Sequence, residues 1–198
     1  MVALAGVDLT LEAGELVALV GPSGSGKTTL LNVLCGWERP EAGRISWQGR
    51  DGIDLATLPW SDIAVVPQSA GLLEDLSVGE NVGLARRMGR GGGPAAGEAG
   101  FVLADLLETL GLDHLSQHLP GGTSLGEQQR AAVARAVLLK PALVLADEPT
   151  AHQDGAFAER VMGVFAASAA SGSCCLIATH SGEVISRVDR VVHLGTPA

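Results

Sequence analysis

The sequence has few of the side chains that mark nucleic-acid binding or membrane insertion. Among its 198 residues there is no tyrosine, and there are only three tryptophans and three phenylalanines. Thirteen basic against twenty-two acidic side chains give a net charge of −9, which argues against a sequence-independent nucleic-acid binder, since that function needs a basic face. Mean hydropathy is +0.29, yet no apolar run approaches the ~18 residues that span a bilayer. We therefore do not expect the chain to cross a membrane by itself.

The cysteines and the start of the chain indicate a reducing compartment. Cys35, Cys174 and Cys175 have no metal-ligand spacing, and an odd number of thiols cannot pair completely in disulfides. We expect them to be small buried residues in a reducing cytosol. The opening segment contains no lysine or arginine and reaches Asp8 and Glu12 early, so the sequence predicts no secretory signal.

Length and patterning predict one α/β domain. A chain of 198 residues, 46% of them apolar and 18% charged, fits one domain with at most a modest insertion. Short apolar runs alternate with segments of helical periodicity, which is typical of a mostly parallel sheet flanked by helices. Strands are predicted at 16–20, 43–49 (an edge strand or hairpin arm), 63–66, 142–146, 174–179 and 188–194, and helices at 27–35, 101–110, 126–139 and 157–170.

Segment 78–139 is helical in composition and resembles an inserted subdomain. The stretch 89–100 interrupts it, and its glycines and proline predict a flexible connection between two helical pieces. The remaining parts, 1–77 and 140–198, would form the core that carries the sheet. We expect these parts to make up a single domain over residues 1–198.

A glycine-rich motif follows the first predicted strand and precedes the first predicted helix. Residues 21–28, GPSGSGKT, match the pattern G-x-x-x-x-G-K-[ST], in which glycines let backbone N–H groups approach phosphate oxygens. Lys27 would reach the β- and γ-phosphates, and the Thr28 hydroxyl would bind Mg²⁺. A glycine-rich turn that matches by chance does not explain the lysine and the hydroxyl. The predicted nucleotide-binding residues are Gly21, Pro22, Ser23, Gly24, Ser25, Gly26, Lys27, Thr28 and Thr29.

Two carboxylates, Asp147 and Glu148, follow the predicted strand at 142–146. The carboxyl end of a strand in an open α/β sheet faces the ligand crevice. Asp147 would hold the Mg²⁺ that Thr28 also binds, and Glu148 would polarise an attacking water, a role that contributes roughly 10²–10⁴ in rate. Taken alone, the pair also fits a solvated turn before Pro149. The phosphate-binding motif favours the catalytic interpretation.

Further motifs follow in a fixed order and resemble those of the ATP-binding subunits of ATP-binding cassette (ABC) transporters. Gln68, in VVPQSAGLLEDLSVGENV (65–82), resembles the Q-loop glutamine of that family. PGGTSLGEQQRAAVARAVLLKPALVLADEPT (120–150) resembles its signature sequence running into the second acidic motif. Asp154 resembles the D-loop aspartate, and His180 the switch histidine. The likeness covers nearly the whole chain and is greatest to lipoprotein-release, macrolide-export and cell-division cassettes.

The resemblance implies that the chain binds and hydrolyses ATP with Mg²⁺ between two subunits. Gln68 would contact Mg²⁺ and water, and both Gln68 and His180 would sense the γ-phosphate. Ser124 and Gly126 would contact the nucleotide of the opposite subunit, since a serine and a glycine at a helix start offer a second anion site. Two chains would then bury two nucleotides in an isologous dimer.

The partners implied are a second ATPase subunit, as a homodimer or a paired chain, and a transmembrane permease subunit. Contact with the membrane would come only through the permease, on its inner face, and no nucleic acid is expected. The transported substrate and its direction belong to other chains.

The family pattern begins with a strand whose aromatic residue stacks on adenine, and this feature is missing. The chain begins almost at LTLEAGE, and Trp37, Trp47 and Trp60 all follow the phosphate loop, so we expect them in the core or an interface. Loss of a stacking contact of about 1–3 kcal/mol would weaken ATP binding roughly 5- to 150-fold. A start codon assigned too late is the alternative explanation.

Other departures concern communication with a partner. Leu125 stands where the signature usually has glycine, so its side chain would either crowd the γ-phosphate or point into the helix interface harmlessly. His152 and Gln153 occupy D-loop positions where smaller or apolar residues are usual. Segment 89–100 lies in the region that docks the membrane subunit in this family.

Three functions remain open from the sequence. The first is the ATPase subunit of a transporter. The second is a non-transport relative acting in DNA repair, translation or iron–sulfur assembly, for which the basic surface, zinc cysteines or second cassette are missing. The third is a module that binds ATP but hydrolyses it poorly.

Overall fold

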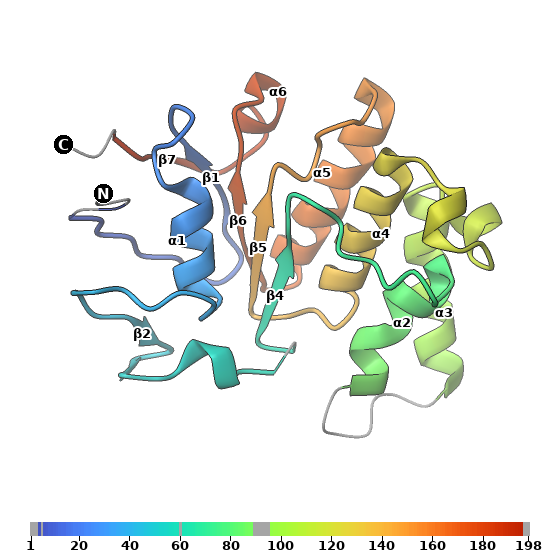
Figure 1. The fold of residues 1–198 in the computed structure, drawn as a ribbon, viewed down its shortest axis with the longest axis horizontal. Coiled ribbons are helices and arrows are strands. Elements are labelled where there is room, and N and C mark those ends of the chain that lie inside the picture. Colours follow the sequence, from blue (N-terminus) through green and yellow to red (C-terminus); the bar gives the residue numbers. More distant parts are fainter. Residues whose placement is uncertain (1–3, 5, 60, 89–95, 196–198) are drawn as a thin grey trace.

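Five parallel strands form the main sheet, in the order β4-β5-β6-β1-β7 (Figure 1). The computed structural model describes residue 4 and residues 6–59, 61–88 and 96–195. The strands are β1 (Leu16–Val20), β4 (Ile63–Val66), β5 (Leu143–Asp147), β6 (Cys174–Ala178) and β7 (Arg190–His193). Every pairing between them is parallel. The predicted α/β class with helices on both faces is confirmed.

Apart from Asp147 at the end of β5, the central strands are apolar because both faces of the sheet are covered. In β5, Leu143 and Leu145 pack into the cluster on the α1 side, whereas Val144 and Ala146 pack into the cluster on the other side. This alternation follows from the two-residue period of a strand. Burial on both faces is the reason why these segments read as unbroken apolar runs.

One face of the sheet is covered by α1 (Lys27–Leu34) and a small hairpin. Gly36 ends α1 with a φ of +78°, as its position in the sequence predicts. The segment predicted at 43–49 is a hairpin arm of which only β2 (Ser46–Trp47) is strand, paired antiparallel with β3 (Arg50–Asp51). Gln48 and Gly49 connect them with φ values of 49° and 74°, as in a type I′ turn. The 3₁₀ turn η1 (Leu55–Thr57) follows.

The other face is covered by helices. They are α2 (Val78–Met88), α3 (Ala96–Thr109), α4 (Leu125–Val137), α5 (Gly155–Ala170) and the short α6 (Gly182–Ile185), with 3₁₀ turns η2 (Asp113–Leu115) and η3 (Pro120–Gly122). The expectation of a non-helical connection over 89–100 is wrong for residues 96–100, which form the start of α3. The two glycines there cost about 1 kcal/mol each relative to alanine, and the segment is helical as the first turns of a helix that continues to Thr109. Residues 89–95 lie outside the described part of the chain.

The helical segment shares one core with the sheet. A single buried cluster joins Val82 of α2, Leu110 and Val133 to Val144 and Ile177 of the central strands. The division into a core and a helical subdomain stays a prediction, although α2 and α3 lie on the outer side of α4 in Figure 1. No helix in the described ranges is both long and apolar enough to span a membrane.

Candidate functional site

The phosphate-binding motif forms the turn between β1 and α1. Gly24 and Gly26 have φ values of +78° and +91°, a left-handed conformation that glycine adopts without strain. At Gly21 an added Cβ would lie 2.7 Å from Leu194 O, so no larger residue fits there. Ser25 is buried, with its side chain only 2% exposed. The glycines of the motif are therefore required by the backbone path.

The start of α1 is arranged for an anion. Its N-cap, Gly26, makes no side-chain capping bond, and the first turn contains no acidic residue. Lys27 Nζ donates hydrogen bonds to Gly21 O at 2.8 Å and Pro22 O at 3.2 Å, which holds the ammonium group over the loop. The positive end of the helix and a lysine thus act on the same space, as phosphate binding requires.

A cavity of about 590 Å³ opens beside this loop. It is lined by Gly21, Ser23, Gly24, Gly26, Lys27, Thr28, Thr29, Gln68, Asp147, Glu148 and His180. These residues come from the loop and from the carboxyl ends of β4, β5 and β6, which is where ligands bind in sheets of this kind. Five predicted residues do not line it: Pro22, Ser25, Ser124, Gly126 and Asp154.

Glu148 is held in a strained conformation at the end of β5. Its φ is +48°, which costs a non-glycine residue roughly 1–2 kcal/mol. The backbone is fixed by Glu148 N–H donating to Ala178 O at 2.9 Å and by Ala151 N–H donating to Glu148 O at 3.0 Å. Strain of this kind persists where the surroundings over-determine it and is common in active sites.

The carboxylate of Glu148 contacts two side chains from the end of β6. His180 Nδ1 lies 2.6 Å from Glu148 Oε1, and Thr179 Oγ1 donates to Glu148 Oε2 at 3.1 Å. The glutamate side chain is 15% exposed, whereas the imidazole is 83% exposed. Glu148 is therefore oriented from one side by two hydrogen bonds and stays open to the cavity on the other.

The neighbouring carboxylate, Asp147, faces the phosphate loop. Thr28 Oγ1 donates a hydrogen bond to Asp147 Oδ2 at 2.7 Å, and Gln68 lines the same cavity. A hydroxyl, one carboxylate and an amide oxygen suit Mg²⁺, which proteins usually bind through one or two carboxylates together with substrate phosphates. The residues present fit the ion that the sequence predicts.

The residues of the signature sequence lie at the start of α4, away from this cavity. Ser124 is the N-cap and forms a capping box with Glu127, in which Glu127 Oε2 accepts from Ser124 N–H at 2.7 Å. This bond holds the pKa of Glu127 below its ordinary value. Leu125 is 65% exposed, so its side chain points to solvent. Ser124 is exposed beside it, whereas Gly126 is buried, and their contact with a second chain stays a prediction.

The D-loop residues pack against the same turn of α4. Gln153 Nε2 donates to Gly126 O at 2.9 Å, and Gln153 Oε1 accepts from Arg130 at 2.7 Å. Asp154 caps α5 by accepting from Phe157 N–H at 3.0 Å. His152 is exposed and has a φ of 62°. Gln153, at a position where smaller or apolar residues were expected from the resemblance, therefore makes two polar contacts.

The backbone on both sides of Gln68 is held by hydrogen bonds from side chains that the sequence analysis did not single out. Gln129 donates to Pro67 O at 3.1 Å, and Arg135 donates to Ala70 O and Gly71 O at 2.9 Å each. Asn81 is fully buried in α2 and bonds to the backbone of residues 73–77. In the sequence, the buried role of Asn81 could be inferred only from its position among the apolar residues of the helical segment that forms α2.

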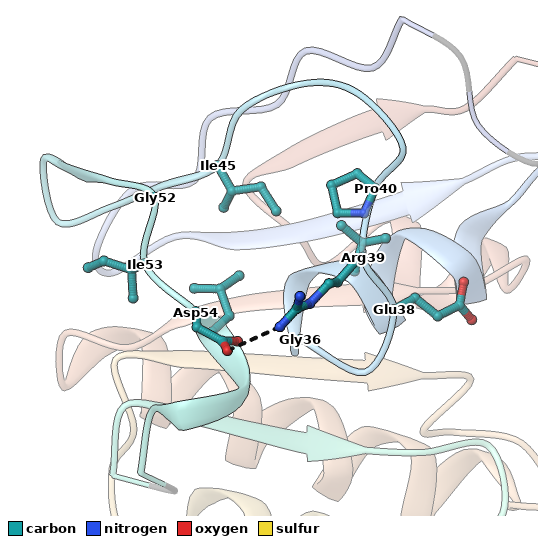
Figure 2. A pocket seen from close by; sticks show the side chains of 10 residues that line it. Gly36, Glu38, Arg39, Pro40, Ile45, Gly52, Ile53 and Asp54 are labelled. Carbon is teal, nitrogen blue, oxygen red and sulfur yellow. Dashed lines mark ion pairs between the residues drawn. The ribbon is translucent and has the colours of Figure 1, made fainter.

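A second cavity, of about 330 Å³, lies at the far end of α1 (Figure 2). Arg39 and Asp54 form an exposed ion pair of 3.6 Å at its rim. It faces the end of α1 at which the helix dipole is negative, which does not favour phosphate. Of the described tryptophans, Trp37 is 63% exposed and Trp47 packs against the α1-side cluster, so neither lines the larger cavity. Trp60 is outside the described residues.

A strand, a glycine-rich loop and a helix that form an anion site, with two carboxylates at the end of a strand in the same parallel sheet, define a P-loop nucleoside triphosphatase. The sequence pattern of the ABC transporter family matches residues 4–151. The chain therefore belongs to the ABC transporter family, and it is an ATP-binding subunit with ATPase activity.

Relatives and solved structures agree with this assignment. The chain is 40% identical over 197 residues to the lipoprotein-releasing system ATP-binding protein LolD 2 of Caulobacter vibrioides, covering 96% of this chain and 85% of that protein. It is 43% identical over 197 residues to LolD of Novosphingobium aromaticivorans, covering 96% and 87%. The dimeric ATP-binding cassette MJ0796, in a post-hydrolysis state with ADP and phosphate, matches with a TM-score of 0.88 and 30% identity, covering 97% and 86%.

Proposed function

We propose that the chain binds ATP and Mg²⁺ in the 590 Å³ cavity and that two chains, paired head to tail, hydrolyse ATP to drive a membrane permease that releases lipoproteins. The observation that carries the proposal is the convergence of the phosphate loop with Gln68, Asp147, Glu148 and His180 on one cavity. The names of the relatives support the transport system, since LolD proteins belong to lipoprotein-releasing systems.

The residues of the chain divide the work by position. Backbone N–H groups of residues 21–28 and the Lys27 ammonium group bind the β- and γ-phosphates and neutralise charge that develops on them. Glu148 orients the attacking water and accepts its proton as general base. The hydrogen bond from His180 keeps the Glu148 carboxylate directed at the cavity.

Thr28, Asp147 and Gln68 would hold Mg²⁺ in this cavity. When bound, the ion supplies positive charge to the β- and γ-phosphate oxygens and orients them for in-line displacement. The hydrogen bond of 2.7 Å between Thr28 and Asp147 keeps both ligand oxygens together before the nucleotide arrives.

The second half of each site would come from the partner chain. The capping box at the start of α4 uses the N–H groups of Ser124 and Glu127, so the N–H groups that would contact an anion there are those of Leu125 and Gly126. The start of α4 does not line the cavity of its own chain, which supports its use in trans. The dimeric cassette MJ0796 supports a pairing of two chains around the nucleotide.

We infer that the chain works in the cytoplasm on the inner face of the cell membrane, bound through a permease subunit. The names of the LolD relatives support such a system, and MJ0796 is described as a bacterial ABC transporter cassette. The net charge of −9 favours a protein partner over nucleic acid. A module with little turnover is disfavoured by the oriented Glu148 carboxylate.

The first experiment compares Glu148→Gln and Lys27→Ala with the unaltered chain. Glu148→Gln should keep ATP binding and lose turnover by a factor of roughly 10²–10⁴, because an amide cannot accept the proton. In Mg-ATP its mass by light scattering should double from 20.1 kDa, since the dimer can no longer hydrolyse its nucleotide. Lys27→Ala should neither bind ATP nor dimerise.

Glu159→Gln is the matched control, because Glu159 lies on the exposed side of α5 in an ion pair with Arg187. It should hydrolyse ATP at the unaltered rate. Full turnover by Glu148→Gln would contradict the role of Glu148, and a monomer at millimolar ATP would contradict the head-to-tail site. Reconstitution with a permease of the lipoprotein-release class then tests the transport step: unchanged ATPase activity would exclude that pairing.

A further inference from the structure

Thr179 connects the strand that leads into the phosphate loop with the strand that ends in the acidic pair. It directly follows β6, which lies between β5 and β1 in the sheet. Its backbone N–H donates to Leu19 O of β1 at 3.1 Å, and its hydroxyl donates to Glu148 Oε2 at 3.1 Å. Leu19 lies two residues before Gly21, at which the phosphate loop begins. One residue is therefore bonded both to the base of the loop and to the carboxylate.

The backbone sets the direction in which the Thr179 hydroxyl donates. Ser181 N–H donates to Thr179 Oγ1 at 3.0 Å, so this oxygen already accepts a hydrogen bond. A hydroxyl has a single hydrogen and an ionised carboxylate can only accept, so the hydrogen points to Glu148. Ser181 is itself held as the N-cap of α6, where its hydroxyl accepts from Val184 N–H at 3.5 Å. The donor that faces Glu148 is thus fixed before any nucleotide binds.

The bond from Thr179 is shielded from water, unlike the contact of Glu148 with His180. Thr179 is 0% exposed, whereas the His180 imidazole is 83% exposed. Water competes for hydrogen bonds at an exposed side chain, and a hydrogen bond in the low-dielectric interior is electrostatically stronger. The Thr179 hydroxyl is therefore the donor that keeps the Glu148 carboxylate in one place when the exposed imidazole moves.

We propose that Thr179 is a positioning residue, which sets the place of the Glu148 carboxylate relative to the phosphate loop and so directs it at the attacking water. The reaction requires the water in line with the γ-phosphate, and a misplacement of about 1 Å can cost about 10²-fold in rate. Thr179 does not line the cavity, so it acts through Glu148 and not on the nucleotide. The inference rests on the role proposed above for Glu148 as general base.

Two variants separate the hydroxyl of Thr179 from its bulk. Thr179→Val keeps the β-branched shape and removes the hydroxyl, whereas Thr179→Ser keeps the hydroxyl and removes the methyl group. Thr109→Val makes the first change at an exposed position, at the end of α3, and serves as the control. The measurements are MgADP affinity by titration calorimetry, and kcat and KM for ATP hydrolysis. Urea unfolding checks that each variant is folded.

We expect Thr179→Val to lower kcat about 10- to 100-fold, because the carboxylate is then free to turn out of line. Its MgADP affinity and its KM should stay within about threefold of those of the unaltered chain, since Thr179 does not line the cavity. Thr179→Ser and Thr109→Val should keep kcat within about threefold. A kcat within about twofold of normal in Thr179→Val would overturn the proposal, as would an equal loss in Thr179→Ser. A parallel loss of MgADP affinity, which indicates general damage to the site, would also contradict it.

A double-mutant cycle tests whether Thr179 acts through Glu148. On a Glu148→Gln background, Thr179→Val should change the residual turnover by less than about twofold, because the group that it positions is already lost. A further loss of about tenfold or more on this background would show that Thr179 acts independently of Glu148 and would overturn the proposal. Full turnover by Glu148→Gln alone would instead refute the proposed role of Glu148, so the two failures are distinguishable.

Discussion

Replacing Asn81 by alanine should destabilise the segment that follows Gln68. The Asn81 side chain is 0% exposed and makes four hydrogen bonds, accepting from Leu73 N–H at 2.7 Å and donating to Leu73 O, Leu76 O and Ser77 O at 2.9–3.1 Å. The amide group has two N–H hydrogens shared among three carbonyls, so the side chain makes at most three full hydrogen bonds, and about 0.5–1.5 kcal/mol for each gives a loss of about 1.5–4.5 kcal/mol. Leu73 O and Ser77 O also accept from backbone N–H groups and stay paired, whereas Leu73 N–H and Leu76 O lose this partner, which favours the middle of that range.

We therefore expect the free energy of unfolding to fall by about 3 kcal/mol, which lowers Tm by roughly 6–12 °C in a chain of this size. Urea unfolding followed by circular dichroism measures the change. Asn32→Ala is the control, since Asn32 makes one exposed hydrogen bond, to Glu38, and its loss should cost about 0.5 kcal/mol or less. A decrease below about 1 kcal/mol for Asn81→Ala, or one equal to that of Asn32→Ala, would refute the reasoning.

Other changes test the fold and its titratable groups. Gly36→Ala should lower the free energy of unfolding by about 2–5 kcal/mol, because φ is +78° and the new Cβ would lie 2.3 Å from Ala56 N. Gly163→Ala, in open space within α5, is the control and should raise it by about 0.5–1 kcal/mol in the same urea assay. Hydrogen bonds from Ser124 lower the pKa of Glu127, so the stability that this carboxylate contributes is present above its ordinary pKa and is lost as the pH falls through its pKa in the folded chain. The urea midpoint of Glu127→Gln should therefore approach that of the unaltered chain between about pH 5 and pH 3. A difference between the two midpoints that stays constant over this range would contradict the prediction. Burial raises the pKa of the Cys174 and Cys175 thiols to about 12 and also raises the pKa of the Cys35 thiol. A thiol-specific disulfide reagent at pH 8 should therefore label the three cysteines only after the chain is unfolded. Rapid labelling of the native chain would contradict this.

Much of the site is predictable because its chemistry is local in the sequence. The phosphate loop needs only a few successive residues between a strand and a helix, and the glycines at 24 and 26 adopt the backbone angles that their identity permits. Asp147 and Glu148 follow from their position at the end of an apolar run. The strands themselves follow from short runs of buried residues, since a sheet covered on both faces has no polar side.

The boundaries and connections were less predictable. Over 96–100, composition alone indicates a loop, yet the residues continue into the packed part of α3 and are helical. The segment 43–49 is predicted as an edge strand or hairpin arm, and its pairing with β3 decides for the hairpin arm and limits the strand to Ser46–Trp47. In both cases the decisive contact lies outside the window from which local propensity is judged.

The sequence by itself determined the class of protein, the phosphate loop and the acidic pair, because each depends on residues that are neighbours along the chain. Only the tertiary structure decided that His180 and Thr179 orient Glu148, that Leu125 points to solvent, and that Gln153 bonds to the start of α4. Those contacts join residues 27 to 32 positions apart or depend on how a side chain is turned. No periodicity or spacing encodes such pairings, because they are set by how helices and strands pack in three dimensions.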